Sequence, residues 1–123
     1  MSTVLVVDDE FGIAEVVEMV LVQRGHRVLS AYNGKQGLEL AIREAPDLMI
    51  VDVMMPVLSG PALIAALRDN RATRVIPVIV ISSLHQDALA IPANNYAGYL
   101  RKPFSIRDLA ALVDRLLAPQ PRP

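Results

Sequence analysis

Short runs of apolar residues alternate along this chain with longer stretches in which apolar residues recur at helical spacing. The runs are continuous and have the length of β-strands, which is typical of strands buried on both faces of a parallel sheet. The longer stretches have the spacing of amphipathic helices. The predicted strands are residues 3–7, 26–31, 48–51, 77–81 and 98–100. This alternation predicts an α/β sandwich built around a parallel sheet.

Helix start and stop signals lie between the predicted strands. Gly25 is placed to end the first helix, because glycine readily adopts the conformation that follows a helix. Asn33 and Ser105 are suited to cap the N-termini of later helices. Residues 84–95 fit a helix least well, because Pro92 limits any helix there to residues 84–90. We therefore expect five helices, of which the fourth is short or irregular.

The composition favours one domain. The chain has 123 residues, of which 53% are hydrophobic, enough for a single packed core. Residues 1–118 are expected to form this domain. Residues 119–123, with the sequence PQPRP, are expected to be a proline-rich tail or the start of a linker.

The net charge and the cysteine content limit the classes of function that are possible. The formal net charge of −1, from 12 basic and 13 acidic residues, argues against direct nucleic-acid binding or an anionic-membrane surface. The lack of cysteine excludes disulfides, zinc–thiolate sites and thiol nucleophiles. No signal peptide is visible, and the apolar residues near 75–81 are too few to span a bilayer. We expect a cytoplasmic protein.

Polar side chains follow four of the five predicted strands. Because the carboxyl ends of parallel strands meet at one edge of a sheet, and ligands bind just outside that edge, we expect these side chains to lie together. They are Asp8 and Asp9 after the first strand, Asp52 after the third, Ser82 and Ser83 after the fourth, and Lys102 after the fifth.

These residue types suit phosphoryl transfer. Carboxylates are ligands for Mg²⁺, which keeps waters or phosphate oxygens in its remaining positions. A carboxylate can also act as a nucleophile and become an aspartyl phosphate. A lysine ammonium and a hydroxyl group can then hold the phosphoryl oxygens. The cluster supplies each of these groups, and phosphoryl transfer needs mainly positioning and charge neutralisation.

Four stretches of the sequence together resemble the receiver domain of two-component response regulators, including the chemotaxis regulators. They are VLVVDDE at 4–10, PDLMIVDVMMPVLSG at 46–60, PVIVISS at 77–83 and YLRKPF at 99–104. They occur in the family's order, and the resemblance covers residues 3 to about 117. It implies a flavodoxin-like three-layer sandwich with five parallel strands in the order 2-1-3-4-5 and five helices.

The resemblance also implies a role for each residue at the acidic edge. Asp52 matches the phospho-accepting aspartate. Asp9 matches the direct ligand of Mg²⁺ (or Mn²⁺), together with Asp52 and the backbone carbonyl of Met54. Asp8 would act on the metal through water.

The remaining matches concern the phosphoryl group and the switch. Lys102 and Ser82 match the residues that hold the phosphoryl oxygens. Ser82 and Tyr99 match the pair that changes position on phosphorylation. The bond before Pro103 is often cis in this family.

The family implies partners as well. A histidine kinase or a histidine phosphotransfer protein would donate the phosphoryl group, and a downstream protein target or effector domain would receive the signal. Phe11, Met19 and Val22 lie on the predicted outer side of the first helix, where the family commonly docks its kinase. The chain would be a signalling switch that assists only its own phosphorylation and dephosphorylation, not an enzyme acting on other substrates.

The residues leave two other functions open. One is a Mg²⁺-dependent phosphatase with an aspartyl nucleophile, although phosphatases of the haloacid-dehalogenase type carry an Asp-x-Asp pattern after the first strand. The other is an interaction module that keeps the fold but works without phosphorylation. The segment between Ser82 and Lys102 is also about two residues shorter than is typical of receivers, which leaves the output surface open.

Overall fold

The computed structural model describes residues 2–55 and 57–118, so the predicted tail at 119–123 lies outside the described residues. Five parallel strands form one sheet in the order β2-β1-β3-β4-β5. The strands are β1 (Thr3–Val7), β2 (Arg27–Ala31), β3 (Leu48–Asp52), β4 (Val78–Ser82) and β5 (Gly98–Arg101). The predicted strand order is therefore confirmed.

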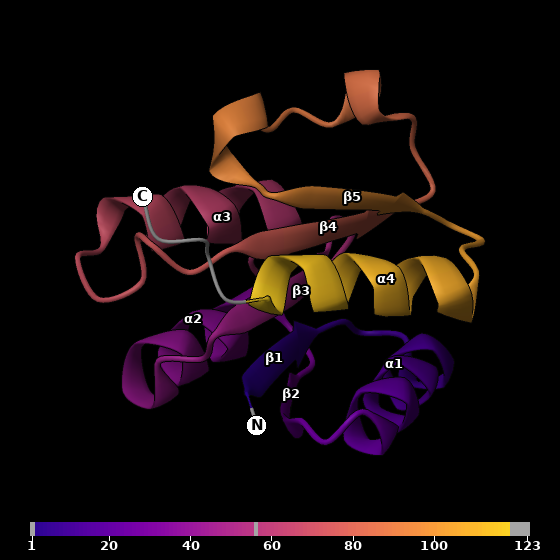
Figure 1. Ribbon diagram of the computed structural model, residues 1–123. Helices are drawn as coiled ribbons and strands as arrows, with labels where there is room; N and C mark the ends of the chain where they lie inside the picture. The colour runs from indigo at the N-terminus through magenta and orange to yellow at the C-terminus, as the bar shows by residue number, and fades with distance from the viewer. Residues whose placement is uncertain (1, 56, 119–123) are drawn as a thin grey trace, which may run out of the picture.

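Helices cover both faces of this sheet, as Figure 1 shows. They are α1 (Phe11–Gln23), α2 (Gly34–Glu44), α3 (Gly60–Asp69) and α4 (Ile106–Leu117). Side chains of β1 alternate between the two faces: Val4 and Val6 pack with α1 and α4, whereas Leu5 and Val7 pack with α2 and α3. The protein is thus a three-layer sandwich with one hydrophobic core on each side of the sheet.

The helix ends follow the local sequence signals. Asn33 Oδ1 accepts a hydrogen bond of 2.8 Å from the Gln36 amide at the start of α2. Ser105 Oγ accepts one of 3.0 Å from the Asp108 amide at the start of α4. Gly25 adopts a φ of +86° just after α1, a backbone conformation that glycine enters without steric cost.

The segment between β4 and β5 corrects one expectation. Within the described residues there are four α-helices and not five, because this segment holds only two short 3₁₀ turns, η1 (Gln86–Ala88) and η2 (Ala93–Asn95). The expected irregularity is confirmed, but it extends to the loss of the whole helix. The apolar residues Leu84 and Leu89 are five positions apart, which places them on no common helical face. Leu89 alone is buried in the core, and Pro92 prevents a helix from continuing.

Within residues 2–55 and 57–118, no helix combines the length and the apolar character needed to cross a bilayer.

Candidate functional site

Three aspartates meet at the carboxyl edge of the sheet. Asp52 ends β3 and Asp8 follows β1, and these two strands are paired neighbours. Asp9 comes next along the chain. Each of the three offers a carboxylate oxygen within 4.8 Å of the others. The predicted meeting of these residues is confirmed.

The three carboxylates differ in exposure. Asp8 and Asp52 are each only 2% exposed, whereas Asp9 is exposed. The pKa of Asp8 is raised from 3.8 to about 6, chiefly by burial and also by the negative charge of Asp52. A hydrogen bond of 2.8 Å from the Glu10 amide to Asp8 Oδ1 and the positive charge of Lys102 act in the opposite direction. The carboxyl edge of the sheet is therefore a partly buried site whose negative charge is not fully compensated by the surrounding hydrogen bonds and by Lys102.

Lys102 supplies the positive charge of this site. Its Nζ lies 3.2 Å from Asp52 Oδ2 and 3.1 Å from Glu10 Oε1. Burial lowers the pKa of Lys102, but the hydrogen bond to Glu10 and the charge of Asp52 outweigh burial, so the pKa is raised overall. The Lys102 amide also donates a hydrogen bond of 2.7 Å to the Ser82 carbonyl, which fixes the lysine at the end of β5. The bond between Lys102 and Pro103 is cis.

Ser82 and Tyr99 are joined through Leu84. Ser82 ends β4, is 1% exposed, and accepts a hydrogen bond of 2.9 Å from the Leu84 amide with its Oγ. The hydroxyl of the half-buried Tyr99 donates to the Leu84 carbonyl. The two residues predicted to form the switch thus hold the same peptide segment, which begins directly after the site.

Met54 lies in the loop after β3, two residues beyond Asp52. Its amide donates a hydrogen bond of 3.3 Å to Asp52 Oδ1, and its side chain is 67% exposed. This contact places the Met54 backbone beside the phospho-acceptor candidate. The role of its carbonyl as a metal ligand stays a prediction.

The outer side of α1 carries the predicted docking residues. Phe11, Met19 and Val22 are all more than half exposed. The Phe11 ring packs on Tyr32, with ring centroids 5.0 Å apart. The chain therefore presents apolar side chains along α1 from the site edge to the far end of the helix.

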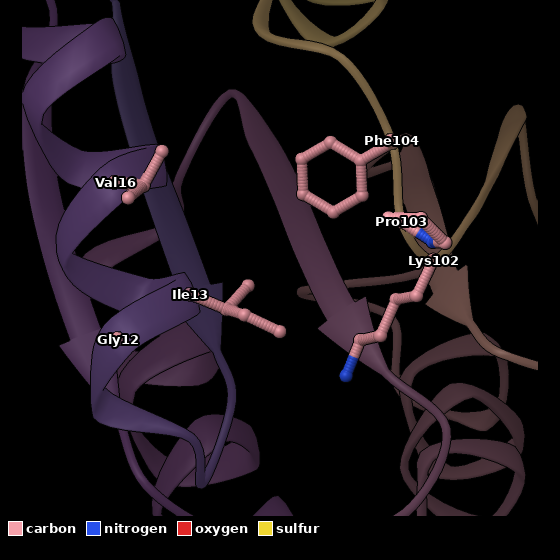
Figure 2. A pocket seen from close by; sticks show the side chains of 6 residues that line it. All are labelled: Gly12, Ile13, Val16, Lys102, Pro103 and Phe104. Carbon is pink, nitrogen blue, oxygen red and sulfur yellow. The ribbon is translucent and has the colours of Figure 1, made fainter.

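An apolar pocket of about 370 Å³ lies between α1 and the loop after β5. Figure 2 shows Ile13 on α1 and Phe104 on the loop facing each other across it, with the stem of Lys102 at one end. Gly12, Val16 and Pro103 complete the lining. The pocket thus shares Lys102 with the acidic site.

Two residues at the site were not assigned a role from the sequence. Glu10 shares the Lys102 ammonium with Asp52, and the only signal was its place as the third acid in the run after β1. Leu84 connects Ser82 to Tyr99 through its backbone, and no side-chain pattern reveals such a contact.

The donor set fits a hard divalent cation. Carboxylates at this separation are ligands that Mg²⁺ takes in proteins, and the ion keeps waters or phosphate oxygens in its remaining positions. Lys102 neutralises only part of the charge of Asp8, Asp9, Asp52 and Glu10. A divalent cation would compensate the rest.

Comparison with known proteins identifies the family. The model of the response regulator receiver domain matches residues 4–114. The transcriptional activator protein PfeR of Pseudomonas aeruginosa is 40% identical over 115 residues, which are 92% of this chain and 37% of PfeR. Response regulator ArlR of Staphylococcus saprophyticus is 32% identical over 99% of this chain and 55% of ArlR. The chain therefore spans about 37% to 55% of the length of these two relatives.

A solved structure gives the same result. It is the receiver domain of sensor histidine kinase PA1611 from Pseudomonas aeruginosa PAO1, with a magnesium ion coordinated in its active site cleft. The TM-score is 0.84 at 28% identity, covering 94% of this chain and 96% of that chain. With its fold, its acidic edge and these matches, the chain belongs to the family of response regulator receiver domains, which act in phosphorylation-based two-component signalling.

Proposed function

We propose that this chain accepts a phosphoryl group on Asp52 from the phosphohistidine of a histidine kinase or histidine phosphotransfer protein, in a reaction that depends on Mg²⁺ (or Mn²⁺). The observation that carries the proposal is the surroundings of Asp52. Its buried carboxylate lies 3.2 Å from the Lys102 ammonium and within 4.8 Å of carboxylate oxygens of Asp8 and Asp9. A candidate nucleophile, a lysine ammonium and candidate metal ligands therefore lie close together, which supports the proposal.

The reaction follows from this arrangement. A carboxylate oxygen of Asp52 attacks the phosphorus, the P–N bond to the donor imidazole breaks, and the imidazole leaves with the electron pair and takes up a proton. Asp9, Asp52 and the Met54 carbonyl would hold Mg²⁺, with Asp8 acting through water. When bound, the ion would neutralise negative charge on the phosphoryl oxygens. Lys102 holds a phosphoryl oxygen through its ammonium, which is already in place beside Asp52.

The signal would pass through Ser82 and Tyr99. In the resting structure Ser82 Oγ is occupied by the Leu84 amide. A phosphoryl group on Asp52 offers Ser82 a charged acceptor, and turning the hydroxyl toward it weakens the bond to Leu84. Because Tyr99 also holds Leu84, its position would change with that of the serine. The phosphoryl group thereby shifts the chain between two states by its differential contacts with them.

The donor is proposed to dock on α1 and the adjoining pocket. The donor's histidine must reach Asp52, so its binding surface has to adjoin the site. The pocket meets this condition because Lys102 both lines it and contacts Asp52. Exposed Phe11 lies at the site end of the same helix, and Met19 and Val22 extend the apolar surface away from it. A helical donor surface with apolar side chains suits this groove.

The output is proposed to be a protein partner or a linked effector domain. PfeR is named as a transcriptional activator and is much longer than this chain, which supports an effector domain in such relatives. This chain itself would be a switch in the cytoplasm and would not bind nucleic acid directly. The domain is proposed to span residues 1–118, with 119–123 as a tail or linker.

Phosphorylation in vitro tests the proposal. Incubation of the protein with acetyl phosphate and Mg²⁺ should add one phosphoryl group that is stable to acid and labile to base, as measured by intact mass. Asp52→Asn should abolish the addition, whereas Asp69→Asn, at an exposed position on α3, should not. Labelling that persists in Asp52→Asn would reject Asp52 as the acceptor. No labelling of the parent protein would favour the phosphorylation-independent interaction module.

A further inference from the structure

Arg68, near the end of α3, binds the backbone of two other segments. Its Nε and Nη2 both donate to the Asn95 carbonyl in η2, at 3.1 and 2.8 Å. Its Nη1 donates to the carbonyls of Arg74 and Ile76, at 2.6 and 3.0 Å. One guanidinium therefore connects α3, the loop before β4 and the segment that replaces the missing helix.

The partners of Arg68 are unusual for a charged side chain. Within residues 2–55 and 57–118, no carboxylate forms an ion pair with it. Burial lowers the pKa of Arg68. Its charge is stabilised instead by the dipoles of the backbone carbonyls to which it donates. A guanidinium has a rigid, planar set of donors, so it holds several acceptors in fixed relative positions. Arg68 is thus suited to fixing backbone.

The segment held by Arg68 has two halves. Residues 84–90, the site-proximal half, begin at Leu84, which is bound to both Ser82 and Tyr99. Residues 92–97, the distal half, contain η2 and the Asn95 carbonyl held by Arg68. Pro92, the first residue of the distal half, provides no amide donor. Unlike a continuous helix, these two short turns share no backbone hydrogen-bond ladder. One side-chain hydrogen bond, of 3.0 Å from Gln86 Nε2 to the Tyr96 hydroxyl, joins the two halves and could carry a displacement between them.

We infer that Arg68 is a positioning residue that fixes the distal half, so that movement starting at Ser82 stays within the site-proximal half. This inference rests on the proposed function, because the movement is that of the proposed switch. The site-proximal half is held differently. Residues 85–88 are exposed, and only Leu89 anchors this half in the core. The surface that changes on phosphorylation is therefore residues 84–90, at the end of the segment nearest the site.

Residue-resolved amide hydrogen exchange tests this division. The protein is measured alone and with Mg²⁺ and the phosphoryl analogue beryllofluoride, as the parent, as Arg68→Lys and as Arg71→Lys. Arg68→Lys keeps the positive charge but loses the planar set of guanidinium donors. Arg71 is an exposed arginine two residues beyond the end of α3 and serves as the control. The reporters are the amides of Asn95 and Ala97 in the distal half, bound to Pro92 and Val78 carbonyls, and that of Leu89 in the other half.

We expect Arg68→Lys to speed exchange of Asn95 and Ala97 by about tenfold without ligand, since two hydrogen bonds to Asn95 are lost. In the parent, beryllofluoride should change exchange within residues 84–90 and leave Asn95 and Ala97 unchanged. In Arg68→Lys the change should spread to both of these residues. Arg71→Lys should match the parent throughout. The spread of the ligand response is the measurement that a purely structural role for Arg68 would not alter.

Other results would overturn the inference. One such result is that the amides of Asn95 and Ala97 exchange at the same rate in Arg68→Lys as in the parent. The other is that beryllofluoride changes exchange in the distal half of the parent as much as in the site-proximal half. Amide exchange in β1 and β3 checks that the variant is folded. Arg68→Gln provides a second variant that lacks the guanidinium donors. If the parent binds no beryllofluoride, the proposed switch fails, whereas the anchoring by Arg68 is still judged from the ligand-free exchange.

Discussion

The ammonium of Lys102 lies 3.2 Å from Asp52 Oδ2, so the last strand of the sheet places a cation against a carboxylate at the end of its central strand. The pair is mostly shielded from water, with side-chain exposures of 16% for Lys102 and 2% for Asp52. Glu10 shares the same ammonium but is 57% exposed. The contact with Asp52 is therefore the one least screened by solvent.

Removing Lys102 should destabilise the metal-free protein. Lys102→Met leaves Asp52 buried beside Asp8 without its counter-charge, which should lower the free energy of unfolding by about 1–3 kcal/mol at pH 8. The double variant Lys102→Met with Asp52→Asn should lose less than the sum of the single variants, because the unpaired charge is gone. Urea unfolding in the presence of a chelator measures these differences. Lys35→Met, at an exposed lysine, is the control, and strict additivity would contradict the coupling.

Asp8 should make the stability of the metal-free protein depend on pH. Because its pKa is raised on folding, from 3.8 to about 6, the folded protein binds this proton more tightly. Stability should therefore fall as pH rises through that window, relative to Asp8→Asn, which keeps an oxygen acceptor for the Glu10 amide. The gap should reach roughly 1–3 kcal/mol at pH 7 in favour of Asp8→Asn.

Thermal unfolding in a chelator at a series of pH values measures this gap. Adding Mg²⁺ should reduce or reverse it, since a bound ligand stabilises the folded state and the parent is expected to bind the ion better. A parent protein that gains stability relative to Asp8→Asn as pH rises from about 4 to 6 would contradict the assignment of the raised pKa.

Val57 should be a site where glycine stabilises the protein. Its φ is +71°, a region that β-branched residues rarely adopt, and its side chain is 76% exposed. Val57→Gly relieves this strain and should raise the free energy of unfolding by about 1 kcal/mol. Val75→Gly is the matched control, because Val75 is exposed but does not have a positive φ. It should be neutral or destabilising in the same denaturation experiment, and equal effects of the two changes would argue against strain at Val57.

Gly60 should be required for a stable, correctly placed Asp52. A Cβ atom at this position would lie 2.6 Å from the Asp52 carbonyl oxygen and 2.7 Å from the Val53 Cα. Gly60→Ala must push α3 away from the end of β3, which should cost roughly 1–3 kcal/mol of stability and slow phosphorylation by acetyl phosphate. Gly12→Ala is the control, since a Cβ there meets nothing within 4 Å. If Gly60→Ala matched Gly12→Ala in both measurements, the close packing would not matter.

The sequence was sufficient for the sheet and for the position of the site. Continuous apolar runs such as residues 48–51 define buried parallel strands, and parallel strands bring their carboxyl ends to one edge. Asp8, Asp52 and Lys102 could therefore be placed together although they are far apart in the chain. The role of each residue came from the family resemblance, because spacing does not distinguish a nucleophile from a metal ligand.

Other features could not be predicted in this way. The bonds from Arg68 to the Asn95 carbonyl join a side chain to a distant backbone group, and such contacts leave no periodic pattern. The positive φ of Val57 is imposed by the loop against the preference of the residue. The loss of a whole helix between β4 and β5 was only partly predicted from Pro92, because the deciding factor is that Leu89 alone finds space in the core.

The strand order also has a consequence for how this protein folds during its synthesis. The acidic edge is encoded in the first half of the chain, whereas Lys102 is translated only after β5. Until Lys102 emerges, β1 and β3 cannot pair without bringing Asp8 and Asp52 together in the absence of their lysine. We therefore expect a nascent chain without β5 to fold poorly, and a product truncated before β5 to be degraded as an unfolded protein instead of persisting as a partly active receiver.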